Sequence, residues 1–123
     1  MLTPLFRVEL AIAADIPVLL PLMEGLADFE HYRDTFGVTA EVLLRQGFSH
    51  QPPDFYCLVA RHTDGHLGGM LVYYFIPFTA SARPTLFIKE LFVNEAYRGH
   101  HLGEELMRAA ARAAVTHDCG AMR

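Results

Sequence analysis

The sequence predicts an α+β fold, because several strand-like segments follow one another without an intervening helix while helices lie before and after them. Apolar residues make up 52% of the 123-residue chain and charged residues 20%, which is enough apolar material for a buried core. The strand-like segments are 55–62, 67–76 and 85–93. Consecutive strands of this kind favour antiparallel pairing, whereas regular alternation of strands with helices would favour a parallel sheet. The length fits one domain, which we assign to residues 1–123.

The N-terminal part is predicted to form one strand and two helices. Residues 6–13 alternate enough for a strand, and apolar residues then recur at helical spacing over about 16–29. Asp15 is the predicted N-cap of this helix, and Pro21 inside it is a potential kink. Thr39 is the predicted N-cap of a second, shorter helix.

The middle of the chain is predicted to form a β-hairpin. The segment 55–62 is rich in aromatic and β-branched residues, and the polar stretch TDGH at 63–66 reads as a turn. The segment 67–76 completes the hairpin. Gly68 and Gly69 at its start indicate a bulge or a close contact with another part of the backbone.

The loop AYRGHHLG, between the strand 85–93 and a helix predicted at about 103–115, has the features of an anion site. Unpaired N–H groups converge at the first turn of a helix, and the helix dipole adds positive potential there. Arg98 adds a guanidinium suited to phosphate, while Gly99 and Gly103 let the backbone come close to a ligand. Judged by spacing alone, a tight turn with a surface arginine explains the loop equally well.

Composition argues against several other classes of function. The net charge is −4 and no basic face is visible, so nucleic-acid binding is not expected. No apolar run reaches the roughly 18 residues of a membrane span, and the first ten residues do not resemble a signal peptide, so we expect a cytoplasmic protein. Two histidines, His100 and His101, are adjacent, and the others are scattered, so no metal site is expected. The scattered histidines are His31, His50, His62, His66 and His117.

Several stretches resemble the GNAT acetyltransferases, and among them the spermidine/spermine (diamine) acetyltransferase branch. LFVNEAYRGHHLGEELM resembles the family's acetyl-CoA signature, R/Q-x-x-G-x-G/A, at a strand-to-helix junction. The other stretches, in the family's order, are LADFEHY (26–32), EVLLRQGF (41–48), FYCLVAR (55–61), GGMLVYYF (68–75) and LFIKELFV (86–93). The resemblance covers nearly the whole chain. It implies a GNAT-like mixed sheet, mostly antiparallel and flanked by helices, that lacks the family's C-terminal strands and helix.

The resemblance also implies an enzyme, an N-acetyltransferase that uses acetyl-CoA, without a metal, to acetylate a small primary amine. A diamine, a polyamine or a lysine-like molecule would be the acceptor. In such proteins the loop clasps the pyrophosphate of CoA, and the backbone of the preceding strand pairs with the pantetheine arm. The implied CoA-binding residues are Leu91, Phe92, Val93, Arg98, Gly99, His100, His101, Leu102, Gly103 and Glu104.

Four residues are implied on the amine side of the site. Lys89 occupies a strand position where this branch often has a glutamate that binds substrate and accepts a proton, and the neighbouring Glu90 is our candidate base. Because side chains alternate across a strand, Glu90 should face away from that side unless a bulge shifts it. Glu30 matches a family carboxylate near the amine, and Phe29 precedes it. Solvated surface charges are the alternative interpretation of both glutamates.

Departures from the family pattern keep a second hypothesis open. His101 stands where the motif usually has its second glycine, Lys89 replaces the glutamate, and no tyrosine follows position 97 to serve as the usual acid. The family's fifth strand would begin near Ala121, where this sequence stops. The alternative is a truncated, catalytically weak CoA-binding or dimerising module. An uncovered strand at 86–93 would also be an apolar sheet edge, so we predict a homodimer that covers it.

Overall fold

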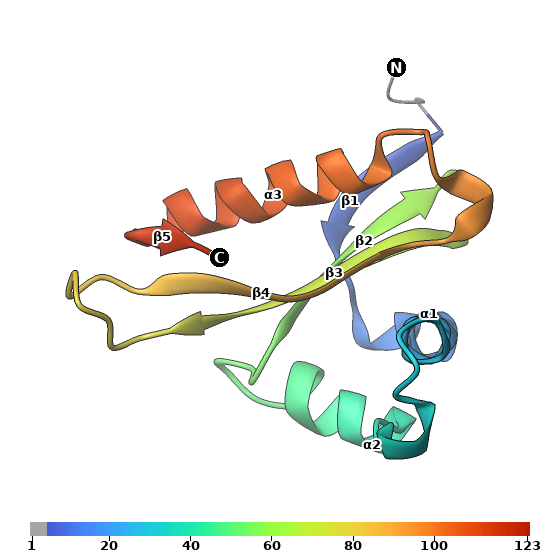
Figure 1. Cartoon of the computed structure of the whole chain (residues 1–123), viewed down its shortest axis with the longest axis horizontal. Coiled ribbons are helices and arrows are strands. Elements are labelled where there is room, and N and C mark those ends of the chain that lie inside the picture. Colours follow the sequence, from blue (N-terminus) through green and yellow to red (C-terminus); the bar gives the residue numbers. More distant parts are fainter. Residues whose placement is uncertain (1–4) are drawn as a thin grey trace.

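The computed structural model describes residues 5–123, whose elements follow the predicted α+β order (Figure 1). Its five-stranded sheet has the order β1-β2-β3-β4-β5; β1 to β4 pair antiparallel, and β5 pairs parallel with β4. This confirms the predicted mixed, mostly antiparallel sheet. The strands are β1 (Phe6–Leu10), β2 (Tyr56–His62), β3 (Leu67–Ile76), β4 (Thr85–Val93) and β5 (Ala121–Met122), and the α-helices are α1 (Ile16–Phe29), α2 (Ala40–Leu43) and α3 (Leu102–Thr116).

Helices cover both faces of the sheet (Figure 1). On one face lies α3, whose Leu106 and Ala110 are fully buried against the strands. On the other face lie α1 and α2, which pack against Val59 and Met70 of the hairpin. Leu71 belongs to the α3 side and its neighbour Met70 to the α1 side, so each strand supplies both cores through its period of two. The small side chains of Ala110 and Ala114 on the buried face let α3 lie close to the sheet.

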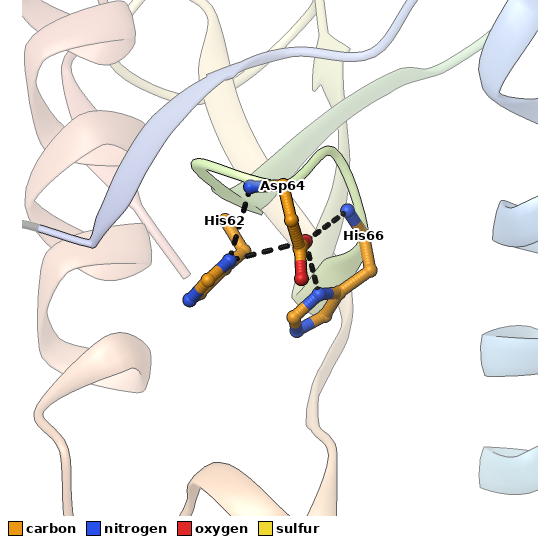
Figure 2. A group of neighbouring side chains, drawn as sticks. All are labelled: His62, Asp64 and His66. Carbon is orange, nitrogen blue, oxygen red and sulfur yellow. Dashed lines mark hydrogen bonds and ion pairs between the residues drawn. The ribbon is translucent and has the colours of Figure 1, made fainter.

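The predicted hairpin is formed by β2 and β3, which are joined by the turn at 63–66 (Figure 2). Its pairing changes register between Ala60 and Arg61, which leaves Gly68 as an extra residue in β3. A Cβ atom at Gly68 would lie 2.7 Å from Cε1 of Phe6. The glycine pair therefore marks both a bulge and a close contact, which confirms the prediction.

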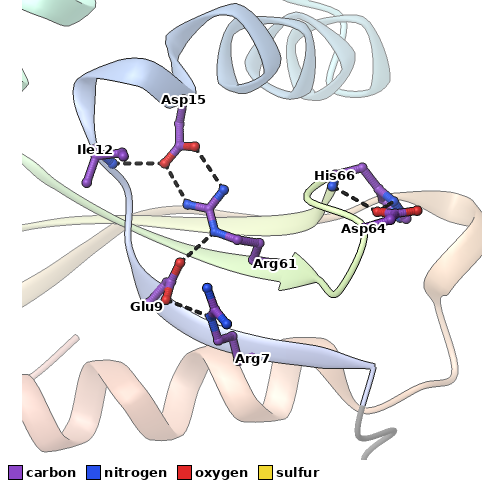
Figure 3. A network of polar contacts seen from close by, with 7 residues as sticks. All are labelled: Arg7, Glu9, Ile12, Asp15, Arg61, Asp64 and His66. Carbon is purple, nitrogen blue, oxygen red and sulfur yellow. Dashed lines mark hydrogen bonds and ion pairs between the residues drawn. The ribbon is translucent and has the colours of Figure 1, made fainter.

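A buried ion pair fixes the start of α1 to the sheet (Figure 3). Arg61 donates to both carboxylate oxygens of Asp15, at 2.9 and 2.8 Å, and its Nε donates to Glu9 at 2.5 Å. Asp15 is the N-cap residue of α1, as predicted, but its side chain makes no bond to the first turn of the helix and instead accepts from the Ile12 N–H at 2.9 Å. The bonds from Arg61 hold the pKa of Asp15 below its ordinary value.

The remaining helix predictions differ in outcome. The helix α1 continues through Pro21 without interruption to Phe29. Thr39 accepts from the Val42 N–H at 3.2 Å and caps α2, as predicted. A π-helical segment, Leu44–Phe48, then carries the chain toward β2.

The outer edge of β4 is covered over only part of its length. β5 begins at Ala121, the position predicted for a fifth strand, and pairs with the start of β4. Arg123 extends this contact, because its N–H donates to Leu86 O at 2.9 Å and its carbonyl accepts from Ile88 N–H at 2.6 Å. The prediction that the edge of strand 86–93 is uncovered is therefore wrong for its first residues, which are paired. Beyond Ile88 no strand of the described part of the chain pairs with this edge. None of the helices within residues 5–123 has the length and apolar character to cross a bilayer.

Candidate functional site

A bulge in β4 turns Glu90 toward α1 and α2. Leu86 and Ile88 pack on the α3 side, and regular alternation would place Glu90 there as well. The β3–β4 pairing shifts at this point and leaves Lys89 as an extra residue, so that Phe92 packs with the α1 core instead. Both Lys89 and Glu90 consequently line one cavity. The bulge on which the predicted orientation of Glu90 depends is therefore present in β4.

This cavity, which we call the acceptor cavity, has a volume of about 340 Å³ and lies between the β3–β4 pair and the segment 32–55. Most of its wall is apolar or aromatic, including Phe36, Phe55 and Tyr74. The adjacent Tyr73 is buried on the α3 side, so the two tyrosines of β3 lie on opposite faces of the sheet. Its charged lining residues are Asp54, Lys89 and Glu90.

Glu90 sits at the centre of a short polar network in the cavity wall. Its side chain is only 16% exposed, and its Oε2 accepts a hydrogen bond from the Tyr32 hydroxyl at 2.8 Å. The Lys89 ammonium lies 3.5 Å from the same oxygen. Burial and the hydrogen bond to Glu90 raise the pKa of Tyr32 to about 12, so this phenol stays protonated at neutral pH. Tyr32 was not predicted as a site residue, although it ends the family-like stretch LADFEHY.

The two residues implied for the amine at the end of α1 do not line the acceptor cavity. Phe29 and Glu30 are both exposed. The Arg98 guanidinium instead lies over the Phe29 ring, with Cζ 5.4 Å from the ring centroid, and 5.8 Å from the centroid of Phe92. The Arg98 Nε donates to Val93 O at 3.1 Å. Arg98 is thus folded back over the end of β4.

A second, open pocket of about 290 Å³ lies where β4 passes into α3, and we call it the loop pocket. Most of the predicted CoA-binding residues of the loop line it. The residues that line the loop pocket are Val93, Tyr97, Arg98, Gly99, His101, Leu102 and Gly103. Of the other predicted residues, His100 and Glu104 are exposed loop and helix-start positions, while Leu91 and Phe92 lie earlier on β4. The structure therefore gathers one part of the predicted set around a cavity and leaves the other part along the strand.

His101 adopts a backbone conformation that favours glycine. Its φ is 63° and its ψ is 19°, in the left-handed region, and it is the N-cap residue of α3. This explains physically why a glycine would be common at this place in the motif. The Nδ1 atom of His101 lies 3.5 Å from a Glu104 carboxylate oxygen, and Arg108 donates to the other oxygen at 2.8 Å. Glu104 thereby supplies negative charge at the start of α3, where an anionic ligand would otherwise lie.

Comparisons with known proteins agree on one family. Residues 22–123 match the model of the acetyltransferase (GNAT) family. The chain is 32% identical over 122 residues to the human spermidine/spermine N(1)-acetyltransferase-like protein 1. The matched region is 95% of this chain but only 17% of that protein. It is 29% identical over 124 residues to mouse thialysine N-epsilon-acetyltransferase, covering 95% and 72% of the two chains.

Solved structures show the same fold at low sequence identity. An aminoglycoside acetyltransferase from an uncultured soil metagenomic sample, in complex with sisomicin, superposes with a TM-score of 0.78 at 18% identity, over 97% of this chain and 76% of that one. Ribosomal-protein-alanine N-acetyltransferase from Brucella melitensis has a TM-score of 0.74 at 22% identity, over 95% and 77% of the two chains.

Proposed function

The chain belongs to the GNAT acetyltransferase family, and we propose that it transfers the acetyl group of acetyl-CoA to a small primary amine. The observation that carries the proposal is the acceptor cavity, where the largely buried Glu90 carboxylate contacts Tyr32 and Lys89 beside the unpaired part of β4. The names of the relatives favour a diamine, a polyamine or a lysine-like acceptor. The cavity offers Asp54 and Glu90 as two anionic groups, which suits an acceptor with more than one amine.

Glu90 is the proposed base. An aliphatic amine has a pKa near ~10 and must lose a proton before its nitrogen attacks the thioester carbonyl carbon. A carboxylate in the cavity wall can accept that proton, and a positioned base of this kind contributes roughly 10²- to 10⁴-fold to the rate. The attack forms the C–N bond and then breaks the C–S bond, so that CoA leaves as a thiolate. Tyr32 positions the carboxylate through its hydroxyl.

The CoA side is proposed to use β4 and the loop pocket. The edge of β4 past Ile88 offers backbone groups at Leu91 and Val93 to the pantetheine arm, and an amide at Phe92 or Val93 would stabilise the developing oxyanion. In the present structure the Val93 carbonyl accepts from Arg98. We expect Arg98 to leave this carbonyl and turn toward the pyrophosphate when CoA binds, since a guanidinium matches phosphate geometry.

A thiol-release assay tests the proposal. Acetyl-CoA with putrescine, spermidine or thialysine should give CoA faster than the reaction without enzyme. Glu90→Gln should lower kcat by about 10²-fold, because the amide cannot take the proton. Glu41→Gln, an exposed change in the first turn of α2, is the matched control and should retain activity. Equal activity of the two variants would remove Glu90 from the mechanism.

A contrast at Tyr32 separates positioning from catalysis. Tyr32→Phe removes the 2.8 Å bond to Glu90 but keeps the ring. We expect kcat to fall while the KM for acetyl-CoA stays unchanged, since the Glu90 carboxylate loses the donor that holds it in place. A variant with an unchanged kcat would show that the hydroxyl serves packing alone.

A second candidate is a CoA-binding or dimerising module with little activity, favoured by the left-handed His101 and by Lys89 at the family's glutamate position. It predicts that CoA raises the Tm without turnover of any of the three amines. The homodimer is proposed under both functions. Light scattering at high micromolar concentration measures it, and a monodisperse monomer would contradict it.

A further inference from the structure

The turn between β2 and β3 brings two imidazoles and a carboxylate together (Figure 2). His62, Asp64 and His66 each offer one ligand atom, and these atoms all lie within 4.8 Å of one another. In the sequence these histidines look scattered, but the hairpin folds positions 62 and 66 onto the same side with the aspartate between them. It is the one such trio of potential metal ligands within residues 5–123.

Both imidazoles of the trio bring Nδ1 close to one carboxylate oxygen. In one tautomer of His62, this nitrogen accepts from the Asp64 N–H at 3.1 Å. The same nitrogen lies 3.0 Å from Oδ1 of Asp64, which is also an acceptor. His66 approaches that oxygen closely through its own Nδ1. Protonated Nδ1 atoms can both donate to Oδ1. Without these protons, the two nitrogen lone pairs and the carboxylate oxygen face one point, where a cation can bind all three.

Neighbouring side chains and the backbone of the turn hold the imidazoles of His62 and His66 in place. The Nε2 atom of His66 lies 2.5 Å from the Tyr97 hydroxyl, which leaves Nδ1 for the trio. Phe6 packs edge-on against both imidazoles, with ring centroids at 5.0 Å from His62 and 6.1 Å from His66. The turn is closed by the bond from His62 N–H to His66 O, at 2.8 Å. An imidazole that gives its second nitrogen to an oriented partner is typical of metal-binding histidines.

We propose that His62, Asp64 and His66 bind one divalent transition-metal ion, with Zn²⁺ as the best match, through the two Nδ1 atoms and the carboxylate. Two imidazoles and one carboxylate suit Zn²⁺ and disfavour Mg²⁺ and Ca²⁺, which prefer oxygen ligands. Ligand bonds of about 2.0–2.1 Å in a tetrahedron place ligand atoms roughly 3.3 Å apart, close to the His62–Asp64 spacing already present. The fourth position is open to water, since the side chains of His66 and Asp64 are 38% and 60% exposed.

The proposed ion would act on the loop pocket through Tyr97. Metal at Nδ1 of His66 fixes the other ring nitrogen as an N–H donor to the Tyr97 hydroxyl. Tyr97 lines the loop pocket and directly precedes Arg98. The metal site itself does not depend on the proposed acetyl transfer, and its test needs no substrate.

Calorimetric titration of tag-free, chelator-dialysed protein with ZnCl₂ tests the site. Wild type should bind one equivalent, and His62→Ala and Asp64→Asn should each weaken binding by at least about 10-fold. His50→Ala is the matched control, because His50 is an exposed histidine 3.5 Å from an aspartate, Asp54, but has no third ligand. This control should bind as wild type does. Absence of saturable binding in wild type, or equal affinity in all four proteins, would overturn the proposal.

A measurement on the wild type avoids any effect of the variants on folding. Imidazole ¹H–¹⁵N correlation spectra should show Zn²⁺ shifting the Nδ1 resonances of His62 and His66 and leaving those of the other histidines unchanged. Co²⁺ in place of Zn²⁺ should give the visible absorption of a four-coordinate ion. Shifts confined to other histidines would refute the assignment, even if calorimetry detects one bound ion.

Discussion

Replacing His101 with glycine should make the protein more stable than an equivalent change at the neighbouring residue. His101 has a φ of 63°, where an L-residue with a side chain pays about 1–2 kcal/mol. A new glycine also costs roughly 0.5–1 kcal/mol, because the unfolded chain gains freedom. The net effect of His101→Gly is therefore a stabilisation of about 0.5 kcal/mol. The lost contact with Glu104 joins two half-exposed side chains and contributes little.

His100→Gly supplies the matched control for this prediction. His100 is an exposed histidine in the same loop, and its φ is not in the positive range, so glycine relieves no strain there. This variant should lose about 0.5–1 kcal/mol through the unfolded-state term alone. The difference between the two variants' changes in unfolding free energy cancels the unfolded-state term. It leaves the cost of the left-handed backbone, about 1–2 kcal/mol.

Urea unfolding of the two variants measures the difference directly. The midpoints should move in opposite directions while the m-values stay equal, since neither change alters the surface exposed on unfolding. If His101→Gly destabilises the protein as much as His100→Gly does, the left-handed residue is not strained. A CoA titration of the same pair shows whether the side chain at 101 also restricts the loop pocket.

Two further predictions concern stability. Asp15→Ala should cost about 3 kcal/mol, because it leaves the largely buried Arg61 guanidinium with fewer partners. Since the folded pKa of Asp15 is lowered, its contribution is present above the unfolded pKa near ~4 and is lost as the pH falls through the folded value, so acid unfolding of the variant should show a shallower pH dependence. Gly68→Ala should cost about 1–3 kcal/mol, because the new Cβ meets Phe6 at 2.7 Å. Gly37→Ala, with open space around it, is its control, and equal urea midpoints for the two would contradict the close contact.

The sequence predicted the strands and helices well because their signals are local. The bounds of β3 and β4 agree with the predicted ranges, since each is a long apolar run ended by turn residues. Asp15 has the predicted N-cap position, but its side chain does not cap α1, because both carboxylate oxygens accept from Arg61 of β2, which is distant in the sequence. The trio around Asp64 was missed for a similar reason, as only the closed hairpin brings its histidines together.

From the sequence, the side of β4 on which Glu90 lies depended on whether a bulge is present. The pairing of β4 explains why. The strand is continuously apolar before Lys89 and after Glu90, so the sequence has no alternation that could reveal the phase change between Ile88 and Glu90. The same point on β4 is where its pairing with β5 ends. One extra residue thus divides the strand into two parts. The first part completes the sheet and packs under α3, while the second turns a carboxylate toward the acceptor cavity and leaves its outer edge unpaired. Because a bulge both re-aims side chains and breaks regular pairing, a single local feature can supply the two things the proposed reaction needs, a base in the cavity and a strand edge for the acyl donor.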